Sequence, residues 1–211
     1  MKNVFFLFSL MLISSGLTAQ ETMEPELIFE GNARIVFNDG TEREGTAVYS
    51  CVTVSRLSFS NGNARPESIR MNDVKEFYIN DMHFVKIIPP GIAIGSSDVI
   101  ARRLNPAGYK ISLYEVVSQS AIGTGDGNGN IVHKTDRTVY AEFPGMKSPR
   151  AIQDLSFSPF HKKVSKLVDD CKDLSSNIAS KKDGYKITML TSPEQKLDIF
   201  QRIAEEFQNC Q

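Results

Sequence analysis

The chain has 211 residues, is 41% hydrophobic and 23% charged, and carries a formal net charge of −1. Such a composition is that of an ordinary globular protein. A nearly neutral chain argues against broad electrostatic capture of nucleic acid, which needs clustered Lys and Arg. Nucleic acid is therefore not an expected partner.

The first residues have the layout of a secretory signal peptide. Lys2 gives a positive start, an apolar run follows over residues 4–13, and small residues lead to Ala19. The run is too short to span a bilayer, which takes about 20 apolar residues. We expect a signal peptide over residues 1–19, cleaved after Ala19, and an exported protein that is periplasmic or secreted. No later run approaches membrane length, so we expect no transmembrane segment in the mature chain.

Residues 20–156 carry the pattern of a β-rich domain. Apolar residues alternate along residues 33–38 and 46–54, on either side of Asp39-Gly40, which predicts a tight hairpin. Further strands are expected over residues 56–60, 74–79, 82–88, 99–104, 109–117, 138–143 and 151–155. No helix-length segment separates them, so they are expected to be antiparallel neighbours. The expected fold class is α+β, an antiparallel β sandwich or open barrel followed by a C-terminal helical segment.

Residues 157–211 change to helical spacing and are expected to pack on the β-rich domain. Apolar residues recur from Phe160 to Cys171, after Ser158-Pro159 as cap and first position. Leu174 and Ile178 either continue this helix or form a second short one.

The last helix has the clearest start. Ser192 precedes Pro193 and stands three residues before Gln195, which together predict a capped helix with proline in its first turn. The helix carries one apolar stripe, expected to pack on the sheet: Phe200, Ile203 and Phe207, flanked by Leu197 and Ile199.

Three cysteines, Cys51, Cys171 and Cys210, bear on the redox compartment. Thiols of an exported protein can oxidise, so pairing is considered first. Cys171 and Cys210 both fall late on predicted helices, and we expect a disulfide between them, with two free buried thiols as the alternative. Cys51 lies in a strand-like segment and is interpreted as a small core residue.

A glycine-rich segment at residues 123–130 has part of a calcium-binding pattern. Asp126, Asn128 and Asn130 occupy the first, third and fifth positions of such a loop. The register then requires Gly and a twelfth-position Glu, where the chain has Ile131 and Arg137. We interpret the segment as a hairpin tip, with weak calcium or glycan contact as the alternative.

No motif in the chain marks a catalytic or metal site. The histidines His83, His133 and His161 are far apart in the sequence, without the spacing of a zinc site. No Gly-x-Ser-x-Gly segment singles out a nucleophile. We therefore expect no catalytic residue, no metal and no cofactor, and we lean against an enzyme.

Two carboxylate pairs invite a glycosidase interpretation. Asp169-Asp170 and Glu205-Glu206 are neighbours on predicted helices, where adjacent side chains point in different directions and do not converge. Trp, a common sugar-stacking residue, is absent. The leading hypothesis is a non-catalytic envelope or extracellular module that binds a macromolecular partner, an envelope protein or a glycan. The alternative is a small secreted hydrolase or a carbohydrate-binding protein.

Several segments resemble small secreted proteins of Bacteroidota-type bacteria. They are residues 37–41 with Glu44-Gly45, residues 73–77 and 113–115, the leader end Thr18-Ala19-Gln20, and the late helix with Cys171 and Cys210. The resemblance spans most of the mature chain but rests on structural motifs. It implies an exported β-rich domain with C-terminal helices, and it assigns no activity and no site residue.

Overall fold

The computed structural model describes residues 27–51, 56–62, 65–90, 98–123, 131–157 and 159–210. Its ten strands form one open sheet in the order β10-β9-β8-β7-β6-β5-β1-β2-β3-β4, and every pairing is antiparallel. The expected signal peptide lies outside the described residues. No helix in the described part of the chain is long and apolar enough to cross a membrane.

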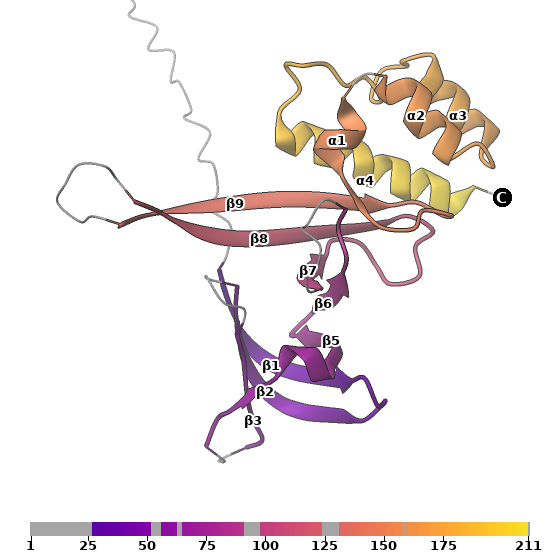
Figure 1. The fold of residues 1–211 in the computed structure, drawn as a ribbon. Helices are drawn as coiled ribbons and strands as arrows, with labels where there is room; N and C mark the ends of the chain where they lie inside the picture. Colours follow the sequence, from indigo (N-terminus) through magenta and orange to yellow (C-terminus); the bar gives the residue numbers. More distant parts are fainter. Residues whose placement is uncertain are drawn as a thin grey trace, which may run out of the picture.

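The strands are β1 (Ile28–Phe37), β2 (Glu42–Ser50), β3 (Arg56–Ser60), β4 (Glu67–Ile69), β5 (Val74–Ile79), β6 (Met82–Ile87), β7 (Val99–Arg103), β8 (Ser112–Gly123), β9 (Ile131–Glu142) and β10 (Arg150–Ala151). The helices are a 3-10 turn (Met71–Asp73), α1 (Ile152–Ser156), α2 (Phe160–Leu167), α3 (Lys172–Ala179) and α4 (Pro193–Asn209). The long β8–β9 hairpin lies between two regions, with β1–β6 on one side and the helices on the other (Figure 1).

The N-terminal region, β1–β6, has a core built from the sheet alone. The expected hairpins at Asp39-Gly40 and Asn80-Asp81 are both present, as β1–β2 and β5–β6. Rings from strands that are not neighbours meet inside: Tyr49 of β2 lies 5.2 Å from Phe84 of β6, although β1 and β5 stand between. Neighbouring strands are about 4.8 Å apart, so the sheet curls to bring these rings together.

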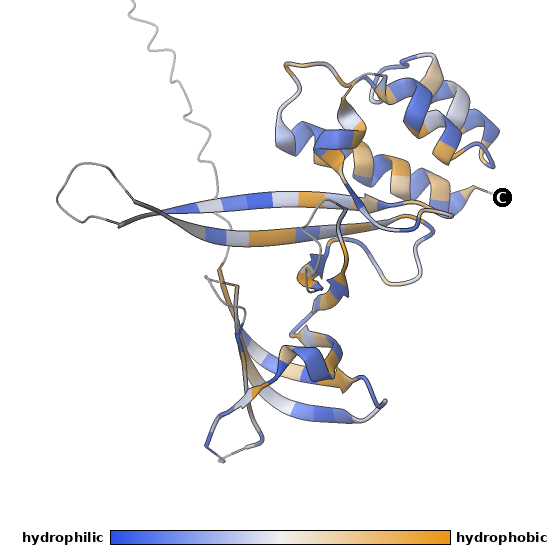
Figure 2. Cartoon of the chain, viewed as in Figure 1, coloured by the Kyte–Doolittle hydropathy of each residue, from blue (hydrophilic) through white to orange (hydrophobic). Residues whose placement is uncertain are grey.

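The C-terminal region is a helical layer over β8 and β9. Its core combines Leu113 and Ala141 of these strands with the expected stripe of α4, and Phe200 and Ile203 are fully buried. Helix α4 begins as expected, with a reciprocal Ser192–Gln195 capping box and Pro193 in its first turn. In Figure 2 orange hydrophobic bands recur along this helix between blue ones, as the stripe requires.

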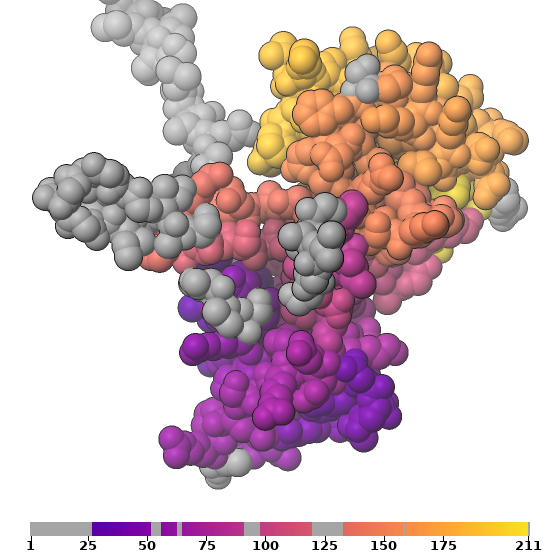
Figure 3. Space-filling view, in the orientation of Figure 1, coloured from indigo at the N-terminus to yellow at the C-terminus, as the bar shows by residue number. Residues whose placement is uncertain are grey.

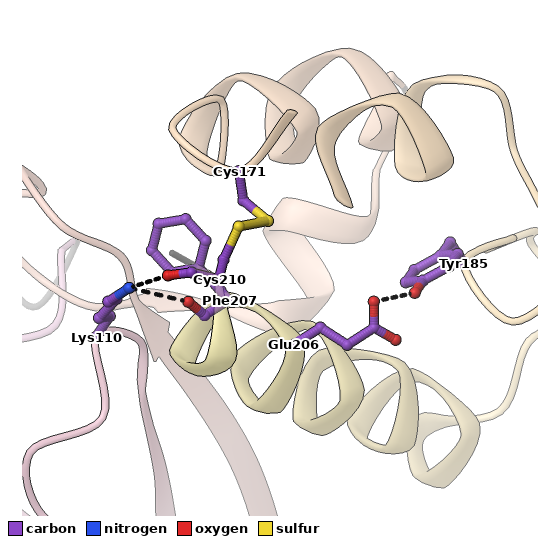
Figure 4. The surroundings of a disulfide bond; sticks show 6 residues. All are labelled: Lys110, Cys171, Tyr185, Glu206, Phe207 and Cys210. Atoms are coloured by element: carbon purple, nitrogen blue, oxygen red, sulfur yellow. Dashed lines mark hydrogen bonds between the residues drawn. A yellow bond between two sulfur atoms is a disulfide. The ribbon is translucent and has the colours of Figure 1, made fainter. Parts of the chain in front are cut away.

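The end of α4 is fastened to its surroundings in two ways (Figure 4). Cys171 and Cys210 form a disulfide, with their Cα atoms 5.8 Å apart, and this is the pair expected from the sequence. Lys110 donates hydrogen bonds to the carbonyls of Phe207, at 3.3 Å, and Cys210, at 2.8 Å. A cation at a helix C-terminus satisfies free carbonyls and opposes the helix dipole.

A buried charge on β8 lies next to the N-terminal core. The N-terminal and C-terminal regions appear as indigo-to-magenta and orange-to-yellow masses in Figure 3. Glu115 of β8 is only 4% exposed and contacts two arginines, Arg102 of β7 at 2.5 Å and Arg137 of β9. A small crevice at the same place is lined by Glu115 and Arg102 together with Phe29 and Cys51 of the N-terminal region. The ion cluster therefore lies where the two cores meet.

Three expectations about local structure are wrong. Residues 152–156 form helix α1 and not a strand, because Ile152 and Leu155, three residues apart, both turn into the helical core. Strands β8 and β9 extend into residues expected to be loop, since their pairing continues in register from Ser112↔Glu142 to Gly123↔Ile131. Strand β4 was missed, because it is only three residues long.

Other expectations are refined. Helices α2 and α3 are separate, with Cys171 as the cap of α3, and Ser158 lies outside the described residues. The helical segment therefore begins within the range assigned to the β-rich domain. Antiparallel pairing with mainly C-terminal helices, and hence an α+β arrangement, is confirmed; the choice between a sandwich and an open barrel is not.

Candidate functional site

The candidate site is a row of polar and aromatic side chains that crosses the outer face of the sheet. The outer face is the one opposite Ile35, Phe77 and Phe84. Cross-strand pairing aligns Arg34 with Tyr78, Tyr78 with His83, Arg103 with Tyr114, and Tyr114 with Tyr140. His83 and Arg103 stand opposite one another one step beyond the Phe84↔Arg102 pair. We call these six residues the Arg–Tyr row: Arg34, Tyr78, His83, Arg103, Tyr114 and Tyr140.

Tyr78 lies at the centre of the exposed part of the row, and both sides of its ring are occupied. The Arg34 guanidinium from β1 lies 4.4 Å from the ring centroid, and the His83 ring from β6 stacks at 4.3 Å. These strands flank β5 on opposite sides. The Tyr78 ring is therefore held in place, and it presents its edge and hydroxyl group rather than an open aromatic face.

The two side chains that flank Tyr78 each contact a carboxylate. Arg34 Nη1 lies 3.3 Å from Glu42 Oε2, and His83 Nε2 lies 2.9 Å from Glu76 Oε2. The hydrogen bond to Glu42 raises the pKa of Arg34, so this guanidinium stays charged. This end of the row therefore carries positive and negative side chains at short spacing.

The far half of the row is more buried and better fixed. Arg103 donates to Ser112 Oγ at 2.8 Å and to the carbonyl of Asn105 at 3.2 Å, and lies 5.9 Å from the Tyr114 ring. The Tyr114 hydroxyl donates to Glu142 at 3.0 Å. Burial raises the pKa of Tyr114, as it does for Tyr78 and Tyr140, so these phenols remain protonated donors at neutral pH.

An open depression of about 780 Å³ adjoins the exposed end of the row. Its walls include Arg34, Tyr78 and Glu44 from the strands, with Asn80 and Asp81 from the β5–β6 turn. Asn80 fixes the rim, because its side chain accepts from the backbone N–H of Asn32 at 3.1 Å and donates to the carbonyl of Glu30 at 3.2 Å. A Cβ on Gly31 would overlap the Asn80 side chain, so glycine is required there.

The structure does not bring the three histidines together. His83 lies in the row on β6, His133 is exposed on β9, and His161 of α2 hydrogen-bonds the carbonyl of Ile178 at 3.1 Å. Burial, followed by the charge of Lys181, lowers the pKa of His161. Within the described ranges no three His, Cys, Asp or Glu side chains are grouped to hold a metal ion.

The remaining sequence candidates are also apart from the row. Asp169 and Asp170 are exposed, and Glu206 accepts a hydrogen bond from Tyr185 at 2.5 Å while Glu205 faces solvent. Cys51, expected to be a small core residue, is only half-buried against the N-terminal core, and burial raises the pKa of its thiol. The expected loop with Asp126, Asn128 and Asn130 lies outside the described residues.

The row itself was not predicted from the sequence. Part of it was within reach, because a two-residue turn at Asn80-Asp81 sets Tyr78 opposite His83 by register. The contact of Arg34 with Tyr78 depends on the pairing of β1 with β5, which is not a local feature of the chain. Only the fold brings those strands together.

Comparison of the chain with protein-family models, with curated proteins and with solved structures found no match.

Proposed function

We propose that this protein is an exported, non-catalytic module that binds a protein partner of the cell envelope through the Arg–Tyr row and its adjoining depression. The observation that carries the proposal is the occupied Tyr78 ring between Arg34 and His83. Sugar-binding platforms use bare aromatic faces, whereas this row offers hydrogen-bonding tips and alternating charges. Such groups complement a polar, mixed-charge protein surface.

Export is supported by the leader-like N-terminus and by the Cys171–Cys210 disulfide, since disulfides persist in oxidising compartments. Cleavage after Ala19, a periplasmic or extracellular location, and kinship with small secreted proteins of Bacteroidota-type bacteria belong to the same proposal. For the N-terminal region we propose an open barrel rather than a sandwich, on the support of the Tyr49–Phe84 contact across the curl.

The test is differential capture from native envelope extract. The purified protein, an Arg34→Ala/Tyr78→Ala variant and an Arg70→Ala control are each used as bait after mild cross-linking. Arg70 is an exposed arginine beside the 3-10 turn and outside the row. We expect one protein species to be retained by wild type and by the control and lost with the row variant. Equal capture by all three baits would contradict the proposal.

A small hydrolase is the second candidate, and one contact favours it. His83 and Glu76 form a base–carboxylate pair at 2.9 Å, the arrangement that orients a catalytic imidazole. The Tyr78 phenol beside it has a raised pKa, which disfavours a phenolate nucleophile. Turnover of chromogenic esters or glycosides that is abolished by His83→Gln, with the fold intact, would favour the enzyme.

Glycan binding is the third candidate function, and this hypothesis predicts a different effect of mutation. A sugar ring would have to displace Arg34 or His83 from the Tyr78 ring before stacking. Removing Arg34 alone would then strengthen glycan binding, whereas it weakens binding of a protein partner. Isothermal titration calorimetry of the Arg34→Ala variant with envelope polysaccharide measures the glycan affinity and so distinguishes the two hypotheses.

A further inference from the structure

Over much of its length the outer edge of β9 has no partner among the strands that the structure describes. β9 pairs with β10 only at Tyr140 and Ala141, and over residues 131–139 no described strand pairs with it on that side. Figure 1 shows β8 and β9 projecting together past the rest of the sheet. A two-stranded ribbon is marginally stable alone, and an open edge is a template for another strand.

Two copies of β9 can pair along this edge about a twofold axis. An axis at Thr135 sets residue 131 of one copy opposite residue 139 of the other, next to Tyr140, where pairing with β10 begins. Twofold axes of this kind generate the commonest closed oligomer, the isologous dimer.

The charges beside Thr135 suit that register. Lys134 and Asp136 are 59% and 47% exposed and lie on the same face of β9, with Nζ 2.7 Å from Oδ1. Pairing about Thr135 sets Lys134 of each copy opposite Asp136 of the other. An axis at Lys134 or at Asp136 would oppose like charges instead, which destabilises cross-strand pairs.

One pairing in this register is less favourable, since His133 stands opposite Arg137 of the second copy. The Arg137 guanidinium is engaged by Glu115 of its own chain, which offsets its charge. From this edge and the charge pattern along it, we infer that the protein forms a twofold-symmetric dimer by antiparallel pairing of β9 with β9 about Thr135. This interface is separate from the Arg–Tyr row and does not depend on the proposed function.

Lysine on an edge strand also serves to prevent pairing. Charge variants distinguish the two roles. Asp136→Lys gives a chain with Lys at both positions, and Lys134→Asp gives a chain with Asp at both. Both single variants lose the internal Lys134–Asp136 contact, so the loss of that contact does not distinguish them. Lys163→Asp, at an exposed position on α2, is the matched control for a change of charge.

The experiment is sedimentation velocity of the purified protein over a range of micromolar concentrations, with circular dichroism to check folding. We expect a concentration-dependent dimer for wild type and for Lys163→Asp. Each single variant at the edge should weaken dimerisation by about tenfold or more, because two symmetric pairs change from attraction to repulsion. An equimolar mixture of the two single variants should restore the dimer, as should the Lys134→Asp/Asp136→Lys double variant.

A wild type that sediments as a monomer at every concentration overturns the inference. A dimer that is insensitive to the single variants also overturns it, because pairing would then use another surface. Restoration of the dimer in the mixture supports the inference. A folding defect in either variant would not be repaired by mixing the two chains.

Discussion

The N-terminal and C-terminal regions of this protein fill their cores by different means. In the N-terminal region a curled sheet encloses its own interior, and four aromatic rings, Phe29, Tyr49, Phe77 and Phe84, contact one another across it. In the C-terminal region, helices cover one stretch of β8 and β9, and a disulfide fixes the last of them. A curled sheet needs large side chains to fill its interior. A helical layer can be held by one apolar stripe on a helix when a disulfide fixes the end of that helix.

The largest expected effect is on these two cores. Phe77→Ala and Phe200→Ala each remove a fully buried ring, and each should lower the free energy of unfolding by about 3–5 kcal/mol. Denaturant titration measures the loss. Hydrogen exchange should localise it, to β1–β6 for Phe77→Ala and to the helices for Phe200→Ala. A change within about 0.5 kcal/mol would show that the side chain faces solvent.

The disulfide should affect the C-terminal region alone. Its sequence separation is 39 residues, for which the chain-entropy relation gives about 3–4 kcal/mol. Cys210→Ala should lower the unfolding free energy by that amount under oxidising conditions, and reductant should bring wild type to the same level. If the variant lost as much with reductant present in both samples, the bond would not be the cause.

The buried glutamate tests whether the regions are coupled. Glu115→Gln leaves Arg102 and Arg137 without their shared counter-charge, and should cost about 2–3 kcal/mol, less than a fully buried pair because both arginines are partly exposed. Thermal unfolding should broaden or split as the regions separate. Glu44→Gln, at an exposed position on β2, is the control and should leave the transition sharp.

The smallest effect is a loss of stability at alkaline pH. Burial and the hydrogen bond to Glu206 raise the pKa of Tyr185 to about 12, above its ordinary value of 10.0. The neutral phenol is therefore favoured in the folded state, so its contribution is complete below pH 10 and is lost as the pH rises toward 12. We expect Tyr185 to contribute a decline of about 1–2 kcal/mol over that interval, so the decline should be smaller by that amount in Tyr185→Phe than in wild type.

The sequence predicted features that depend on neighbouring residues. Three features were predicted correctly because a few adjacent side chains determine each of them. They are the hairpins at Asp39-Gly40 and Asn80-Asp81 and the capped start of α4. The Cys171–Cys210 pair was expected because both cysteines fall late on predicted helices, and the disulfide is present.

Features that depend on distant contacts were not predicted. Residues 151–155 were expected to form a short strand, but residues 152–156 are helical, and Ile152 and Leu155 both enter the helical core. The Arg–Tyr row needs β1 beside β5, and the ion cluster needs β7, β8 and β9 together. In each case the pattern of one segment is compatible with several structures, and tertiary packing selects among them.

The position of the disulfide also decides how the protein responds to a protease. Between the bonded cysteines lies a turn whose tip, Met189 and Leu190, is 99% and 95% exposed, an accessible point for cleavage. A nick there would leave both fragments covalently joined and α4 still held against the sheet. The cleaved protein should therefore run as one band on a non-reducing gel and as two after reduction.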